Sequence, residues 1–298
     1  MQMDTADILK KVRQIEIQTG KLVEETFAGE YLSTFKGQGI EFSEVREYIP
    51  GDDIRSIDWN VTARTGVPYV KKFNETRELT LMIACDVSAS QRFGSLNKFK
   101  QDTAAELAAF FAFSALKNSD KVGLLLFSDK VELYVPPKKG KKHILRLIRE
   151  LVAFEPTGTG TDISMALTML NQVMKHQGIL IFISDFLADT ASYEKPFRLA
   201  AKKFDLIPVI IQDCLEKELP KLPICLDVRD PETGEEKFLS LGTKALSQML
   251  HLRQDTWQTQ LAQLFNPLKV EPIWVDTAQP TADPVIRFFK QRARKVRQ

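Results

Sequence analysis

The order of hydrophobic and polar positions changes character near Leu79. From there onward, short apolar runs alternate with longer amphipathic stretches, as strands alternate with helices. This alternation predicts an α/β fold, with a mostly parallel sheet flanked by helices on both faces. At the other end of the chain, residues 4–19 place apolar side chains at helical spacing and predict a separate N-terminal helix.

The elements predicted after Leu79 follow one another in regular order. Strands are expected at residues 79–86, 122–127, 130–135, 178–184, 206–211 and 270–275, the third of them as an antiparallel edge strand. Helices are expected at residues 96–117, 141–153, 163–175, 193–203, 243–265 and 284–294. The prolines at 136–137 open a predicted loop. Two further short strands, 224–228 and 236–239, flank a turn and predict a hairpin within an insertion near residues 213–242.

The stretch from about Glu30 to Asn74 has a different pattern. Short β-like pieces alternate with turn residues, and charges of both signs are interleaved with aromatic and aliphatic side chains. This mixture predicts a small β-rich module, which serves either as a structural cap or as a docking surface. The predicted organisation is therefore an N-terminal helix (1–20), a small charged β module (21–78) and a large α/β domain (79–298).

Composition narrows the class of protein. The chain has 298 residues, of which 44% are hydrophobic and 27% charged, and its net charge of +2 gives no reason to expect a nucleic-acid partner. Cys85, Cys214 and Cys225 lie in or beside apolar runs and form no CxxC pair, as in a reduced protein. We find no signal peptide and no apolar run long enough to span a bilayer. A cytoplasmic location is therefore expected.

Candidate chemistry gathers where the first predicted strand of the large domain ends. The apolar run 79–85 is followed directly by Asp86, and then by Ser88 and Ser90 at alternate positions. In a parallel sheet, ligands bind in the crevice at the carboxyl ends of the strands. Carboxylate and hydroxyl oxygens are ligands that Mg²⁺ and Ca²⁺ prefer. These three residues therefore predict one corner of a divalent-cation site.

Two further loops are expected at the same edge of the sheet. One follows the strand 178–184 and begins with Asp185, and the other is the Gly-rich turn that contains Thr161. Two carboxylates and three hydroxyls from these loops can form an oxygen site completed by water. Because the hydroxyl ligands are neutral, the bound cation retains positive charge, which attracts an acidic side chain of a partner protein.

The three motifs, Asp86-x-Ser88-x-Ser90, then Thr161 and then Asp185, resemble the metal-ion-dependent adhesion site of von Willebrand factor A domains. The resemblance implies that Ser88 and Ser90 bind Mg²⁺ (alternatively Mn²⁺ or Ca²⁺) directly, and that Thr161 binds it directly or through water. Asp86 and Asp185 would hold coordinated waters. Asp185 is followed by Phe186, where many such domains have glycine. The implied fold is a von Willebrand A-like, Rossmann-like sheet.

The run from Gly37 to Arg64, which contains EYIPGDDIRSIDWN, resembles the signature of a bacterial family called domain of unknown function fifty-eight. With it, the resemblance covers nearly the whole chain. Members of that family are von Willebrand A-like and are typically encoded beside MoxR-type AAA+ ATPases. The resemblance implies an adaptor or cofactor role with such an ATPase, in chaperone-like assembly or maturation of complexes.

A phosphatase-like, metal-dependent hydrolase is the alternative function, because a strand-end aspartate such as Asp86 is also the nucleophile of haloacid-dehalogenase-type enzymes. Those enzymes need a second aspartate two residues later as general acid, and Ser88 stands there. The chain has no GxSxG motif, and its Gly-rich turn lacks the Lys-Ser/Thr of a phosphate-binding loop. The sequence therefore favours a non-enzymatic interaction module without catalytic residues.

Overall fold

The computed structural model describes residues 5–23, 41–74, 79–95, 98–217, 222, 224–229 and 234–296. The chain divides into two compact units. One consists of residues 35–79, and the other of residues 1–34 together with 80–298.

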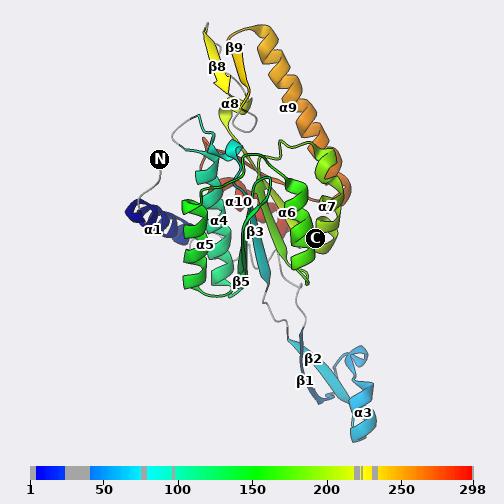
Figure 1. The fold of residues 1–298 in the computed structure, drawn as a ribbon. Helices are drawn as coiled ribbons and strands as arrows, with labels where there is room; N and C mark the ends of the chain where they lie inside the picture. Colours follow the sequence, from blue (N-terminus) through cyan, green and yellow to red (C-terminus); the bar gives the residue numbers. More distant parts are fainter. Residues whose placement is uncertain are drawn as a thin grey trace. The chain divides into compact units, whose positions relative to one another are not determined.

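A six-stranded sheet in the order β10-β7-β6-β3-β4-β5 forms the centre of the larger unit (Figure 1). Its strands are β3 (Thr80–Asp86), β4 (Lys121–Phe127), β5 (Val131–Lys138), β6 (Ile179–Ser184), β7 (Asp205–Gln212) and β10 (Ile273–Asp276). Neighbouring strands are parallel, except that β5 pairs antiparallel with β4 at one edge. The chain winds outward from β3 to β5 and then outward from β6 to β10, so the strand order reverses between β3 and β6. Ligands bind at such a switch point in open α/β sheets.

Helices cover both faces of the sheet, which confirms the predicted fold class (Figure 1). On one side lie α4 (Lys100–Lys117), α5 (Lys141–Ala153) and α10 (Ala282–Val296), and on the other lie α6 (Ile163–Val173), α7 (Thr190–Lys203) and α9 (Lys244–Phe265), which continues into η4 (Asn266–Leu268). The N-terminal helix α1 (Thr5–Leu22) lies outside α4 and α5. It is joined to them by the ion pairs Lys11–Asp102 and Glu16–Lys141.

The strands next to the switch point are buried on both faces. Every residue of β6 is buried, as are all residues of β3 except Thr80. This explains why both strands are almost continuous apolar runs, as is typical of the centre of a parallel sheet. Because the apolar run of β3 ends in Asp86, this carboxylate lies at the carboxyl end of a buried strand. Only 1% of the surface of Asp86 is exposed.

Aromatic rings fill the layer between the sheet and the helices α6, α7 and α9. Successive centroids lie 5.0–6.3 Å apart in the cluster of Phe127, Phe182, Phe186, Tyr193, Phe197 and Phe265. Each such pair contributes about 0.5–1.5 kcal/mol beyond the burial of its apolar area. The cluster includes Phe186, the residue after Asp185, and therefore anchors the loop that follows β6.

Two elements of the larger unit bear on expectations from the sequence. The predicted hairpin is present as β8 (Cys225–Arg229) and β9 (Glu236–Ser240), which follow the short helix α8 (Cys214–Lys217). The loop predicted to open at the prolines 136–137 is wrong, because β5 continues through both prolines to Lys138. An edge strand can accommodate proline because one side of it lacks a hydrogen-bonded neighbour.

The smaller unit combines an antiparallel pair, β1 (Glu41–Glu47) and β2 (Tyr69–Asn74), with η2 (Ile54–Ser56) and the helix α3 (Trp59–Thr65). The β pair agrees with the predicted β-rich module, and the helix α3 is an element that the sequence pattern did not predict. Asp58 caps this helix by accepting hydrogen bonds from the N–H groups of Asn60 and Val61, and Gly66 ends it at a φ of 75°. The glycines at 37 and 39 lie outside the described residues.

An ion pair orders the loop after β1. Arg46 binds Asp52 through both carboxylate oxygens, at 2.7 and 2.8 Å, and Asp52 also accepts a hydrogen bond from the N–H of Ile49. The hydrogen bonds from Arg46 and Ile49 lower the pKa of Asp52. The ion pair between Arg46 and Asp52 therefore fixes a turn in this module.

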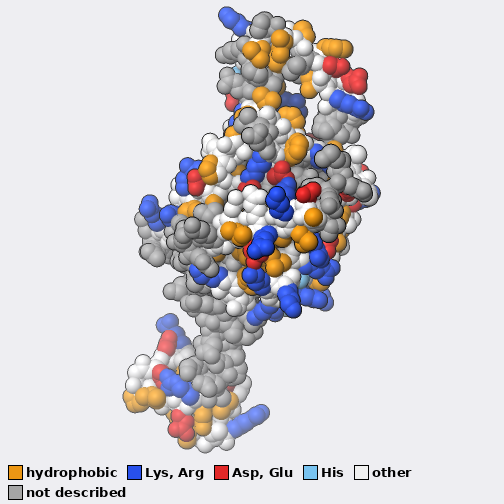
Figure 2. All heavy atoms as spheres, turned by 90° about the vertical axis from the view of Figure 1, so that its left-hand side faces the viewer, with side chains coloured by type: hydrophobic (Ala, Val, Ile, Leu, Met, Phe, Trp, Pro, Cys, Tyr) orange, Lys and Arg blue, Asp and Glu red, His pale blue; other side chains and the backbone are white. Residues whose placement is uncertain are grey.

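Figure 2 shows a face on which basic, acidic and hydrophobic side chains are interspersed. Three basic residues of the larger unit have acidic partners: Lys141 pairs with Glu16, Arg292 with Asp205, and Lys295 with Glu271. None of the helices in the described part of the chain combines the length and apolar character needed to cross a bilayer.

Candidate metal centre

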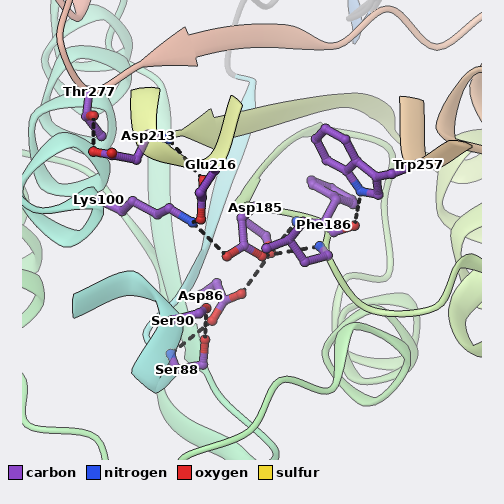
Figure 3. A network of polar contacts seen from close by, with 12 residues as sticks. Asp86, Ser88, Ser90, Lys100, Asp185, Phe186, Asp213, Glu216, Trp257 and Thr277 are labelled. Atoms are coloured by element: carbon purple, nitrogen blue, oxygen red, sulfur yellow. Dashed lines mark hydrogen bonds and ion pairs between the residues drawn. The ribbon is translucent and has the colours of Figure 1, made fainter. Parts of the chain in front are cut away.

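The loop after β3 brings three of the predicted site residues together. The N–H of Ser88 donates to Oδ1 of Asp86 at 2.9 Å, and the hydroxyls of Ser88 and Ser90 lie 3.1 Å apart. Ser90 belongs to the single-turn helix η3 (Ala89–Arg92). The short turn thus folds both hydroxyls back toward the carboxylate, as Figure 3 shows.

The loop after β6 is joined directly to this carboxylate. The Ser184 hydroxyl donates to Oδ2 of Asp86 at 2.8 Å and accepts from the N–H of Phe186 at 3.2 Å. Asp185, which lies between Ser184 and Phe186 in the sequence, is 3% exposed. The structure therefore places Asp86 and Asp185 at the ends of adjacent strands, with one serine hydroxyl linking their loops.

Phe186 has a backbone conformation that is unusual for its residue type. Its φ of 54° lies in the left-handed region, which glycine adopts at little cost. Its side chain is fully buried in the aromatic cluster, and its carbonyl accepts a hydrogen bond of 2.8 Å from Nε1 of Trp257 on α9. The position therefore has a conformation that favours glycine, and packing enforces it on a phenylalanine.

The Gly-rich turn forms the third side of the site. The Thr159 carbonyl accepts a hydrogen bond of 3.1 Å from the N–H of Ala89, which joins the turn to the loop after β3. Glu132 on β5 accepts hydrogen bonds from the N–H groups of Thr157 and Gly158 and from the hydroxyl of Thr157. The partly buried Thr161 lies in this turn, next to Asp162, whose carboxylate caps α6 by accepting from the N–H of Met165.

Burial of carboxylates dominates the electrostatics of the site. Burial, followed by the charge of Asp185, raises the pKa of Asp86 to about 7, although hydrogen bonds from Ser88 and Ser184 oppose the shift. Burial likewise raises the pKa of Glu216 on α8. A site with this arrangement favours an added positive charge, because a cation would offset the cost of ionising Asp86.

One positive charge is already built in beside the site. Nζ of Lys100, at the start of α4, lies 3.2 Å from Oδ2 of Asp185 and also pairs with Glu216 (Figure 3). Burial lowers the pKa of Lys100, but the two carboxylates outweigh this and raise it overall. The ammonium therefore stays charged although its side chain is 0% exposed.

A second set of hydrogen bonds connects this lysine to the insertion. Asp213 accepts from the hydroxyl of Thr277 at 2.7 Å and from the N–H of Ser95 at 3.1 Å, while its own N–H donates to Glu216 at 3.0 Å. Burial raises the pKa of Asp213, but the hydrogen bonds that its carboxylate accepts from Ser95, Thr277 and Leu215 outweigh burial and lower the pKa overall. The start of α8 is thus held at the same edge of the sheet as Asp185.

The donor atoms suit a hard divalent cation. Asp86, Asp185, Ser88 and Ser90 present only oxygen, which favours Mg²⁺, Mn²⁺ or Ca²⁺ over metals that prefer nitrogen or sulfur. Within the described ranges, no group of three or more His, Cys, Asp or Glu side chains is arranged to hold a metal. Both amide atoms of Gln91 are buried next to Ser90 without a hydrogen-bond partner in the described structure. The residues present fit a cation held by carboxylates, hydroxyls and water.

The structure brings together the predicted residues Asp86, Ser88, Ser90 and Asp185, and it places Thr161 in the adjoining turn. Sequence reasoning missed Ser184, Lys100 and Glu216. The spacing of Lys100 from Ala104, Leu107 and Phe111 on α4 offered a signal, because it puts the lysine on the buried face of the helix. Nothing local distinguished Glu216, which meets Lys100 across 116 residues.

The Gly-rich turn can be tested by adding one methyl group. A Cβ at Gly158 would lie 1.9 Å from Oδ1 of Asp129 and 2.2 Å from Oγ of Ser128, whereas a Cβ at Gly160 meets its nearest atom at 3.7 Å. We therefore expect Gly158→Ala to lower the free energy of unfolding by about 1–2 kcal/mol in urea titrations, and Gly160→Ala to change it by less than about 0.5 kcal/mol. Equal effects of the two substitutions would contradict this account of the turn.

Trp257→Phe should loosen the loop after β6. The variant removes the donor to the Phe186 carbonyl, and leaving a buried polar group unpaired costs about 1–3 kcal/mol. Thermal or urea unfolding measures the loss, and hydrogen exchange should increase at the N–H of Phe186. Trp274→Phe removes an indole that is 38% exposed and serves as the matched control, with a smaller effect expected. If both variants lose the same stability, the hydrogen bond to Phe186 does not account for it.

The free energy of unfolding, measured in EDTA, should fall as the pH rises from about 4 to about 7. The pKa of Asp86 is about 7 in the folded protein against an ordinary 3.8, so the folded state binds more protons than the unfolded state in this window. The decrease is on the order of a few kcal/mol, since one pKa unit corresponds to about 1.4 kcal/mol. Asp86→Asn should flatten the profile, because asparagine has no carboxyl proton to lose in this window. An unchanged slope in Asp86→Asn would refute the assignment.

Comparison with known proteins gives relatives of unassigned function. An uncharacterized protein of Mycobacterium tuberculosis is 29% identical over 241 residues, which cover 80% of this chain and 75% of that protein. The uncharacterized protein YeaD of Bacillus subtilis is 27% identical over 109 residues, covering 37% of this chain and 25% of that protein.

Similar solved structures include the conserved hypothetical protein BatB of Bacteroides thetaiotaomicron, with 14% identity and a TM-score of 0.45 over 74% of this chain and 98% of that chain. A von Willebrand factor type A protein of Catenulispora acidiphila has 11% identity and a TM-score of 0.43 over 74% of this chain and 43% of that chain. Residues 44–256 match the family model described as protein of unknown function DUF58. Since the match spans more than half of the sequence, the chain belongs to the DUF58 family.

Proposed function

We propose that this chain is a non-enzymatic, metal-dependent protein-interaction module. The observation that carries the proposal is the meeting of Asp86, Ser88, Ser90 and Asp185 at the carboxyl ends of β3 and β6. In this proposal the two serine hydroxyls bind Mg²⁺ directly and Thr161 binds it directly or through water. Asp86 and Asp185 hold the coordinated waters. The cation supplies positive charge that an acidic side chain of a partner protein binds.

The arrangement around Asp86 supports binding over hydrolysis. A phosphatase-like hydrolase needs a proton donor two residues after the nucleophile, and at that place Ser88 donates its backbone N–H to Asp86. Both oxygens of Asp86 accept hydrogen bonds within the protein, and its carboxylate is buried. This carboxylate is therefore better placed to orient ligands than to attack a phosphoester.

The partner proposed is a MoxR-type AAA+ ATPase, with the chain acting as its adaptor in chaperone-like assembly or maturation of complexes. Membership in the DUF58 family supports this choice, through the association that the sequence resemblance implies. The small unit, with Ile49, Ile54 and Trp59 more than half exposed, is a further surface available to such an assembly.

Binding to a MoxR-type ATPase of the same organism, measured by biolayer interferometry, tests the proposal. With Mg²⁺ present, Asp86→Ala and Ser88→Ala should each weaken binding about tenfold or more, equivalent to about 1.4 kcal/mol. EDTA should reduce wild-type binding to the level of these variants. Ser192→Ala, at an exposed position of α7, is the matched control and should bind as the wild type does.

Two results would contradict the proposal. One is unchanged binding by both site variants, in Mg²⁺ and in EDTA alike. The other is robust turnover of a small phosphoester with Mg²⁺ that disappears in Asp86→Asn, which would instead support the hydrolase.

A further inference from the structure

Lys100 occupies an energetically costly place. Its side chain is fully buried, and it is the first residue of α4, where the positive end of the helix dipole disfavours a cation. Removing an ammonium from water costs several kcal/mol unless it is paired. Its ion pairs with Asp185 and Glu216 provide this compensation. A lysine at this position is thus tied to these two carboxylates.

The same ammonium binds a carboxylate of the candidate cation site. Nζ of Lys100 lies 3.2 Å from Oδ2 of Asp185, while Oδ1 accepts a hydrogen bond of 3.3 Å from the N–H of Leu187. In the described part of the chain, Lys100 is the basic residue found in an ion pair with Asp185. Figure 3 shows Lys100 and the Asp86–Ser88–Ser90 loop on different sides of Asp185.

We infer that Lys100 is a built-in counter-ion that sets the affinity of the candidate site for divalent cations. This inference rests on the proposed function. The ammonium neutralises Asp185 in the absence of a divalent ion and repels an ion that enters beside Asp86. Glu216 acts in the opposite direction, because it shares the ammonium and adds negative charge. The site therefore binds Mg²⁺ or Mn²⁺ more weakly than its oxygen ligands alone would.

Removing the charge of Lys100 and removing the charge of Glu216 should change the affinity for divalent cations in opposite directions. Lys100→Met replaces the lysine with a neutral side chain of nearly the same length and volume. Because this removes a positive charge, the affinity for divalent cations should rise. Glu216→Gln leaves the ammonium to Asp185 alone and removes a negative charge, so divalent affinity should fall. Structural damage, by contrast, would weaken binding in both variants.

Mn²⁺ is the probe, and its dissociation constant is measured by calorimetry and by the electron paramagnetic resonance signal of free Mn²⁺. Relative to the wild type, we expect binding about tenfold tighter in Lys100→Met and about threefold weaker in Glu216→Gln, as expected for charges a few ångströms from the ion. Circular dichroism establishes that each variant is folded. Lys98→Met is the matched control, because Lys98 pairs instead with Glu106 and Thr281, and its affinity should equal that of the wild type.

The outcomes separate this inference from the proposed function. If the wild type binds Mn²⁺ and folded Lys100→Met binds it no more tightly, the inference is wrong and the metal site stands. If only Lys100→Met binds, the inference stands and the wild type is not metal-dependent. If neither binds, both are wrong. Should Lys100→Met not fold, unchanged or tighter binding by Glu216→Gln overturns the inference.

Discussion

Two carboxylates buried at the ends of adjacent parallel strands are the constraint around which this structure is arranged. Asp86 and Asp185 each have 3% or less of their surface exposed, so water cannot solvate their charge. The protein responds with hydrogen bonds from Ser88 and Ser184 on one side and with the Lys100 ammonium on the other. These compensations are incomplete, because the pKa of Asp86 remains raised. A cation stabilises a site most where a carboxylate that is hard to ionise lies beside other oxygen atoms.

Packing holds a strained backbone conformation in place beside these carboxylates. The left-handed Phe186 turns the chain sharply after Asp185, and the aromatic cluster together with Trp257 keeps it there. Packing on the α7 and α9 side of the sheet is therefore linked to the direction of a carboxylate on its edge. A glycine would adopt the same φ without strain, but it could not anchor the loop in the core.

Much of the fold and part of the site could be predicted from the sequence, for identifiable reasons. Continuous apolar runs revealed β3 and β6, and the abrupt polar residue after each run located Asp86 and Asp185. The helix α3 was missed because its signals, the Asp58 cap and Gly66, lie among many other turn-forming residues. Lys100 and Glu216 could not be paired in advance, since only the tertiary fold brings together residues so distant in sequence. The metal ligation and the partner remain predictions.

Contacts beyond the candidate ligands connect the site to the start of the insertion. Lys100 joins Asp185 to Glu216, and Glu216 accepts from the N–H of Asp213, where β7 gives way to α8 and the hairpin. A change in charge beside Asp185 must therefore alter the forces on α8, because both carboxylates share one ammonium. This shared charge gives the site a physical connection to α8, where the insertion begins. The start of the insertion thus belongs electrostatically to the site, although none of its residues is among the proposed ligands.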